Sequence, residues 1–232
     1  MLADKLQYFE EVCKRETKTY LATCSGDLLQ ACQTFDPLLE HLYNFACCYW
    51  GCHGKEHVLE YLAGRTVCHL ISAHGLTERG YYDEAISLVR SVGEIANLLN
   101  LFWADKRNIR AWLDSSQTER RDKFAPYRVR KELESLKHLI PFNDAHYKRL
   151  CELAVHPTPE TRPNAYHDRQ RPALGGYFQP EGFSSVFWEM CWALAVVTGP
   201  VSKLALFPQS EAERMVELTV PLFKLAAGNV SE

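Results

Sequence analysis

Apolar side chains recur at spacings of three and four along nearly the whole chain, and almost nowhere do they alternate as in a half-buried strand. The helical period is clearest over 81–103, where the apolar stripe comprises Tyr82, Ala85, Ile86, Val89, Val92, Ile95, Leu98, Leu99 and Phe102. After residue 182 the segment is apolar on more than one side, as in a buried helix. We therefore predict an all-α fold, a bundle of about seven or eight helices with the 81–103 helix at its centre.

Proline, glycine and capping residues give approximate boundaries to these helices. The pairs Ser116/Glu119 and Ser210/Glu213 have the spacing of capping boxes, and Asn143 is suited to an N-cap position. The predicted helices include 2–23, 27–50, 55–76, 81–103, 144–155 and 210–227.

The segment 157–182 is the one long stretch without a helical period, and it holds five prolines and three glycines in 26 residues. Its aromatic and basic residues argue against disorder, so we predict one long ordered loop packed on the helices. No internal repeat divides the chain, and the loop is too short to link independent domains. Residues 1–232 are therefore predicted to form a single domain.

Composition places the chain among ordinary globular proteins. Hydrophobic residues make up 47% and charged residues 24% of the sequence, which excludes collagen-like, disordered and disulfide-scaffold classes. The net charge of −3 provides no overall field that would attract a nucleic acid or an anionic membrane. Between 105 and 131 there are nine Lys and Arg residues against four Asp and Glu residues, an excess typical of the solvated face of surface helices.

The first residues contain no apolar run of the kind found in signal peptides. The most apolar segment, 183–206, is interrupted by Glu189, Pro200 and Lys203, so a buried core helix is a better interpretation than a membrane span. Nine cysteines without a secretion signal are expected to be reduced thiols. These features predict a cytoplasmic protein with no membrane contact and no disulfide.

A group of cysteines and histidines lies within eleven residues: Cys47, Cys48, Cys52, His53 and His57. Cys48 and Cys52 are one helical turn apart, as are His53 and His57, and this spacing suits metal ligands. Structural zinc sites usually draw their ligands from two separated pairs, however, and this group lies across a predicted helix end among aromatic residues. We therefore expect no metal ion. The common nucleotide, metalloprotease and hydrolase motifs are also missing, so no cofactor is predicted.

The central helix also carries a polar stripe, formed by Ser87, Arg90, Glu94 and Asn97. Arg90 and Glu94 are one turn apart, so we expect them to pair and to be mostly buried, because an unpaired charge in a core is costly. The pair either specifies the register of the helix or contributes to a ligand-binding site, and the sequence leaves both interpretations open.

A second candidate site precedes the predicted loop, where six residues separate Arg149 from His156. Seven helical positions return to nearly the same face about 10 Å along the axis, so both side chains can reach one groove. A histidine that titrates near neutrality could act as general acid/base in RNA cleavage while the arginine stabilises the charge on the phosphate. The alternative is structural: Arg149 caps carbonyl groups at its helix end, and His156 bonds to the following loop.

With these motifs the chain resembles the HEPN superfamily, because Arg90-x3-Glu94 on a central helix is followed by Arg149-x6-His156 where a helix ends. It resembles more closely a set of bacterial proteins of unknown function placed beside that superfamily. Their pattern has a tyrosine and a His-Pro pair near this point, as do Tyr147 and His156 with the proline that follows it.

The resemblance extends over residues 55–167. Many HEPN proteins are metal-independent ribonucleases that act as dimers in toxin–antitoxin, abortive-infection or CRISPR-linked defence, and others are non-catalytic. For an active member the resemblance implies that Arg149 and His156 of both subunits are catalytic. Further contacts with RNA would come from Tyr147, His167 and Arg171.

Two functions follow from the sequence. The first is a non-enzymatic, HEPN-like binding or interaction module, with a protein, a second copy of the chain or RNA as its partner. The alternative is a metal-independent HEPN-type endoribonuclease. Leu150, which follows Arg149 where active members usually have a polar residue, favours the first. Exposure of Arg149 and His156 in an open cleft would favour the second.

Overall fold

The structure is a computed structural model that describes residues 1–156 and 175–230. Within these residues it contains ten α-helices and no strand, so the predicted all-α class is confirmed. The helices are α1 (Leu2–Thr23), α2 (Gly26–Ala46), α3 (Val58–Glu78), α4 (Tyr82–Ala104), α5 (Arg107–Asp114), α6 (Gln117–Phe124), α7 (Pro126–Ser135), α8 (Asp144–Ala154), α9 (Pro180–Leu204) and α10 (Gln209–Ala227).

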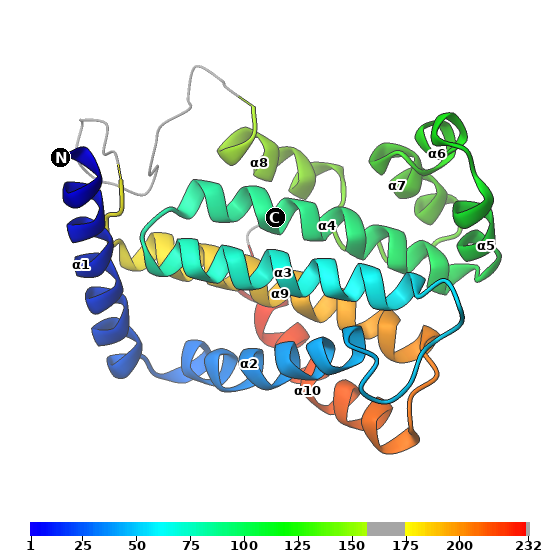
Figure 1. The fold of residues 1–232 in the computed structure, drawn as a ribbon, viewed down its shortest axis with the longest axis horizontal. Coiled ribbons are helices and arrows are strands. Elements are labelled where there is room, and N and C mark those ends of the chain that lie inside the picture. Colours follow the sequence, from blue (N-terminus) through cyan, green and yellow to red (C-terminus); the bar gives the residue numbers. More distant parts are fainter. Residues whose placement is uncertain (157–174, 231–232) are drawn as a thin grey trace.

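Three long helices, α3, α4 and α9, lie side by side through the middle of the molecule, and α2 and α10 pack along one side of them (Figure 1). The most extensive packing joins α4 to α9, α9 to α10 and α3 to α4. At one end α1 crosses the bundle, while the short helices α5, α6 and α7 gather at the other (Figure 1). The helix predicted to be central, α4, therefore occupies the centre, and α8 lies on it.

One large cluster of buried apolar side chains fills the space between these long helices. α9 is buried over most of its length. By length and composition α4 and α9 are each apolar enough to span a membrane, but 67% and 78% of their apolar windows are buried inside the fold. This burial agrees with the interpretation of 183–206 as a core helix.

Helix boundaries follow the prediction where a local capping bond forms. The Asn143 side chain accepts a backbone hydrogen bond at 2.9 Å and starts α8, and Ser116 with Glu119 forms the predicted capping box of α6. The second predicted box is wrong. α10 begins at Gln209, whose side chain donates to Glu213 at 2.8 Å, so this glutamate does not cap the helix.

The predicted number of helices is too low, because ten occur in the described residues. In the charged region after α4, the sequence indicated a helix that opens at Ser116 and a second charged segment after Pro126, which are α6 and α7, but it did not indicate α5. α5 and α6 have eight residues each and no buried residue. The apolar stripe of α5 comprises only Ile109, Trp112 and Leu113, which are partly buried against the core, and α6 has no such stripe.

Most of the predicted loop, residues 157–174, lies outside the described residues. At its described end the loop is shorter than predicted, because α9 begins at Pro180, and proline is favoured in the first turn of a helix. Gly176 lies so close to the end of α3 that an added Cβ would come within 2.1 Å of the Arg79 carbonyl oxygen. This end of the loop is therefore packed on the turn between α3 and α4.

Gly93 allows the close approach of α4 to the segment before α8. A Cβ atom at this position would lie 2.6 Å from the ring of Phe142, which is fully buried. We expect Gly93→Ala to lower the free energy of unfolding by about 1–3 kcal/mol, the usual cost of overpacking a core. Urea unfolding followed by circular dichroism measures this loss.

Gly75→Ala in α3 is the matched control, because nothing lies within 4 Å of its added Cβ. It should be neutral or should stabilise the protein by up to about 1 kcal/mol, as alanine favours helix over glycine. Equal stability of the two variants would contradict the close contact at Gly93.

Candidate functional site

The polar stripe predicted on the central helix is the surface on which α8 packs. Ser87 Oγ donates to the Ala154 carbonyl at 2.9 Å, at the end of α8. The Asn97 side chain exchanges two hydrogen bonds, of 2.9 and 3.1 Å, with the backbone of Phe142, just before α8 begins. The other two stripe residues lie between these contacts. α8 is therefore antiparallel to α4, and the stripe sets the register between the two helices.

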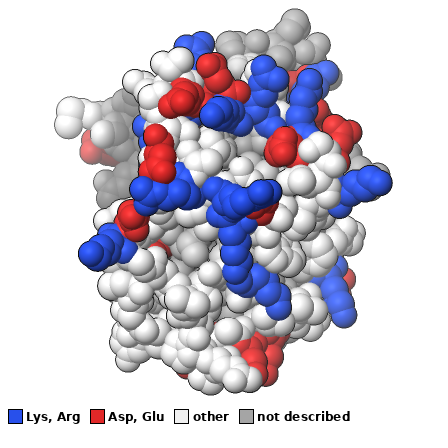
Figure 2. All heavy atoms as spheres, turned by 90° about the vertical axis from the view of Figure 1, so that its right-hand side faces the viewer, with Lys and Arg blue, Asp and Glu red and all other residues white. Residues whose placement is uncertain are grey.

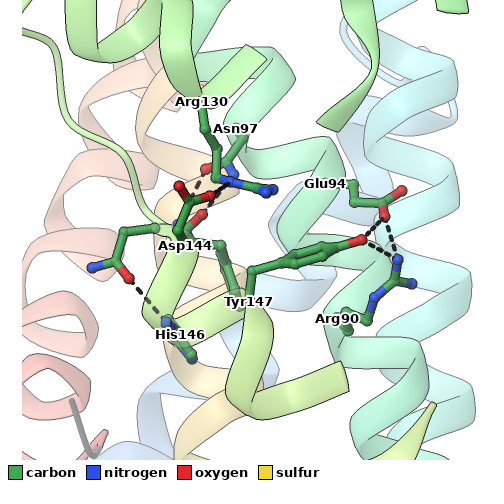
Figure 3. A network of polar contacts seen from close by, with 9 residues as sticks. Arg90, Glu94, Asn97, Arg130, Asp144, His146 and Tyr147 are labelled. Carbon is green, nitrogen blue, oxygen red and sulfur yellow. Dashed lines mark hydrogen bonds and ion pairs between the residues drawn. The ribbon is translucent and has the colours of Figure 1, made fainter. Parts of the chain in front are cut away.

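Arg90, Glu94 and Tyr147 form the middle of this α4–α8 seam (Figure 3). Arg90 Nη2 donates to Glu94 Oε1 at 2.6 Å, and the Tyr147 hydroxyl donates to the same oxygen at 2.8 Å. Arg90 also donates to that hydroxyl and, through Nε, to Cys151 Sγ at 3.1 Å. The predicted ion pair is confirmed. Its side chains are mostly buried, as predicted, although Arg90 and Glu94 remain 20% and 34% exposed.

Two guanidinium groups lie over the Tyr147 ring. The Cζ atoms of Arg90 and Arg130 are 4.7 and 4.4 Å from the ring centroid, distances that favour cation–π attraction. Arg130 of α7 also forms an ion pair with Asp144 at the start of α8 (Figure 3). Burial, followed by the hydrogen bond to Glu94, raises the pKa of Tyr147. Its hydroxyl therefore stays protonated and remains a donor at neutral pH.

Arg149 is held at the interface of α8 with α9. Its guanidinium forms an ion pair with Glu189, and the other oxygen of this carboxylate lies 2.8 Å from His146 Nε2. The Glu189 side chain is only 3% exposed, so burial of its charge depends on these partners. Arg149 was expected either to anchor a phosphate or to cap helix carbonyls; the structure gives it a buried carboxylate on another helix instead.

His156 is exposed just beyond the end of α8. Its backbone N–H bonds to the Cys151 carbonyl, but α8 has ended two residues earlier, so regular helical spacing from Arg149 does not extend to it. Among the described residues, no hydrogen bond or ion pair joins the side chains of Arg149 and His156. The other two predicted contact residues, His167 and Arg171, lie outside the described residues.

Four residues that hold Arg149 and Tyr147 in place belong to no motif in the sequence: Glu189, His146, Arg130 and Asp144. Glu189 did carry a usable signal, because it is the one acidic residue in the buried part of α9. A charge inside an otherwise apolar helix requires a partner. The identity of that partner depends on how α8 packs on α9, which no local pattern reports.

The basic excess over 105–131 does not produce a uniformly positive surface. Figure 2 shows positive and negative side chains interspersed on the face that carries α5, α6 and α7. Several arginines of this region pair with acidic neighbours: Arg107 with Asp105, Arg110 with Asp114 and Glu56, and Arg130 with Asp144. The expected solvated helix face, with mixed charge, agrees with this arrangement.

An apolar hollow of about 270 Å³ lies between α4, α9 and α10. Trp103, Leu139 and Val220 line it and are 39%, 47% and 44% exposed. Exposed apolar residues around a hollow are typical of sites that receive apolar groups.

A cluster of metal-ligating side chains lies apart from the α4–α8 seam, in the loop between α2 and α3. The ligand atoms of Cys48, Cys52 and His57 all lie within 4.8 Å of one another. All nine cysteines of the chain are free thiols.

No family model, curated protein or solved structure matches this chain.

Glu189→Ala removes the carboxylate that joins Arg149 to His146. We expect it to lower the free energy of unfolding by about 3 kcal/mol, because a largely buried cation loses its partner. Glu152→Ala is the control in α8: its ion pair with Lys148, at 3.5 Å, lies at the surface, and its loss should cost less than about 1 kcal/mol. Chemical denaturation compares the two variants. Equal losses of unfolding free energy in the two variants would show that the Glu189 ion pair contributes no more to stability than a surface pair.

Tyr147→Phe retains the ring under Arg90 and Arg130 but removes the hydroxyl that donates to Glu94. We expect a loss of about 1 kcal/mol, the usual net contribution of one hydrogen bond. Tyr127→Phe is the control, since Tyr127 is 47% exposed and its change should stay within about 0.5 kcal/mol. Wild-type stability in Tyr147→Phe, measured by the same denaturation, would mean that the hydroxyl contributes nothing to the seam.

Proposed function

We propose that the protein is a non-enzymatic binding module of HEPN-like type whose partner is another protein. The observation that carries this proposal is the ion pair between Arg149 and Glu189. A cation that stabilises charge on a reacting phosphate has to be available to the substrate. The Arg149 guanidinium is already paired with the buried Glu189 carboxylate, which His146 also contacts.

The other arginines of the seam support the same function. Arg90 pairs with Glu94, and Arg130 pairs with Asp144, so each of these guanidinium groups has a carboxylate partner within the fold. A phosphate would have to displace these carboxylates in order to bind. The arginines are therefore best understood as connections that hold α8 on its neighbours.

Two surface features favour a protein over RNA as the partner. The charge on the α5–α7 face is mixed (Figure 2), and RNA binding draws most of its affinity from concentrated positive charge. The hollow between α4, α9 and α10 has exposed apolar residues at its edge, which fits an apolar side chain of a partner protein.

A metal-independent ribonuclease is the second candidate function. It is favoured by the exposure of His156 at the end of α8, together with the 26% of the Arg149 side chain that remains exposed. A general acid/base needs such access to its substrate. In this candidate function a second copy of the chain would complete the site, as the resemblance implies.

We expect the wild-type protein neither to cleave single-stranded RNA in the presence of EDTA nor to bind it with salt-dependent affinity, because its candidate phosphate-binding arginines are paired. Gel analysis of a labelled RNA measures cleavage, and fluorescence anisotropy at low salt measures binding. His156→Ala is the informative variant, since an exposed residue can be replaced without disturbing the core. His74→Ala is its matched control, because the His74 side chain is 33% exposed and lies in α3, outside the seam.

Metal-free cleavage that is lost in His156→Ala and kept in His74→Ala would contradict the proposal and establish the nuclease. Salt-dependent binding without cleavage would replace the protein partner with RNA.

A further inference from the structure

The loop between α2 and α3, residues 47–57, folds three potential metal ligands together. Cys48 Sγ lies 3.5 Å from His57 Nδ1, and both atoms lie within 4.8 Å of Cys52 Sγ. A tetrahedral zinc ion, with bonds of about 2.3 Å to sulfur and about 2.0 Å to nitrogen, holds a sulfur and a nitrogen about 3.5 Å apart. The Cys48 and His57 atoms therefore already have the separation that such an ion requires.

The three ligands are also accessible. Cys52 is exposed, and Cys48 and His57 are half-buried. An ion could enter from solvent at the Cys52 side while the other two ligands hold it against the protein. A feasible entry path is one of the requirements for a metal site.

A buried carboxylate lies next to these ligands. Glu60, in the first turn of α3, has a side chain that is 1% exposed, and its Oε1 lies 3.7 Å from His57 Nδ1 and 3.6 Å from His53 Nδ1. Its Oε2 has no hydrogen-bond partner among the described residues, and neither ring nitrogen of the buried His53 has one. A buried charge with incomplete partners is costly. A cation held by the three neighbouring ligands would pair with this carboxylate.

The backbone supplies an independent indication. Cys48 and His57 have φ values of 57° and 48°, in the left-handed region that residues with a Cβ adopt at a cost of about 1–2 kcal/mol. Gly51 and Gly54, between them, also have positive φ, of 106° and 87°, and they adopt it without that cost. Two of the four left-handed positions in this loop are thus ligand residues. Such strain persists where surrounding interactions hold it, and it clusters at ligand sites.

We propose that the α2–α3 loop binds a single Zn²⁺ ion through Cys48, Cys52 and His57, with the Glu60 carboxylate beside the fourth position. The sequence argued against zinc because the cluster comes from one short segment. That objection loses its force in the folded loop, where the left-handed turns bring the three ligands together and α3 adds a buried carboxylate. The site lies at the connection between α2 and α3 (Figure 1) and does not depend on the proposed function.

The donor set selects the metal. Two thiolates and an imidazole suit zinc, whereas Mg²⁺ and Ca²⁺ prefer oxygen ligands. The role is structural, since the ion would join the end of α2 to the start of α3. It would also secure the packing of His53 against Phe45 and Phe207, whose ring centroids lie 5.3 and 6.0 Å away.

The full-length protein, purified under reducing conditions without chelator, should contain one zinc ion per chain by elemental mass spectrometry. After zinc has been removed with EDTA, titration with Co²⁺ should produce the visible bands and the near-ultraviolet thiolate charge-transfer band of tetrahedral cobalt. The EDTA-treated protein should also melt at a lower temperature, because an ion that binds only the folded state stabilises it.

Matched variants locate the site. Cys48→Ser and Cys52→Ser should each weaken the charge-transfer band and the double variant should abolish it, whereas Cys68→Ser, at an exposed cysteine of α3, should retain it. Glu60→Gln should weaken zinc binding by about 10–100-fold, the usual effect of losing a group that supports the ligands. Glu56→Gln, at a 52% exposed glutamate of the same loop, should leave affinity unchanged. Far-ultraviolet circular dichroism checks that each variant is folded.

The proposal is overturned if stoichiometric Co²⁺ gives no thiolate band in the wild-type protein, a test that needs no variant. It is also overturned if a folded Cys48→Ser/Cys52→Ser double variant keeps the wild-type zinc content, or if Cys48 and Cys52 form a disulfide in protein purified without oxygen. None of these measurements involves RNA or a protein partner, so their outcome is separate from that of the proposed function.

Discussion

Every charged side chain that α8 turns towards its neighbours must find a partner there, because burying an unpaired charge costs more than the helix could gain from packing. Glu189 is the strictest case. It lies in the most buried helix of the fold and is compensated by Arg149 and His146 from α8. The packing of α8 against α4, α7 and α9 depends on such pairs.

The same constraint bears on the interpretation of Arg149 and His156. An arginine and a histidine at this spacing can act on a phosphate when neither side chain has a partner within the protein. When the arginine or the histidine pairs with a carboxylate of the fold, its role is structural. Here the arginine is compensated by a carboxylate that comes from a distant part of the chain. The spacing of the arginine and the histidine is the same for a catalytic and for a structural role. In this chain the ion pair with Glu189 favours the structural role. The charge pairing is therefore the main support for the proposed binding module.

The α2–α3 loop presents the opposite electrostatic situation. In the α4–α8 seam, Arg90, Glu94 and Tyr147 satisfy one another, whereas Glu60 Oε2 and both ring nitrogens of His53 have no hydrogen-bond partner among the described residues. Two thiols and an imidazole gather beside them on a strained backbone. The unpartnered carboxylate oxygen of Glu60, beside three potential metal ligands, is the physical reason for assigning an ion to that loop.

The sequence by itself determined the all-α class, the central position of α4 and the polar stripe along it, because apolar and polar spacing reports which side of a helix is covered. It also determined the caps at Asn143 and Ser116, since a capping bond joins residues three positions apart. Only the tertiary structure decided that Glu189 would hold Arg149, forty positions earlier in the chain, and that Cys48, Cys52 and His57 would meet. Those contacts depend on how whole helices pack and on left-handed turns at non-glycine residues, and neither leaves a periodic pattern in the sequence.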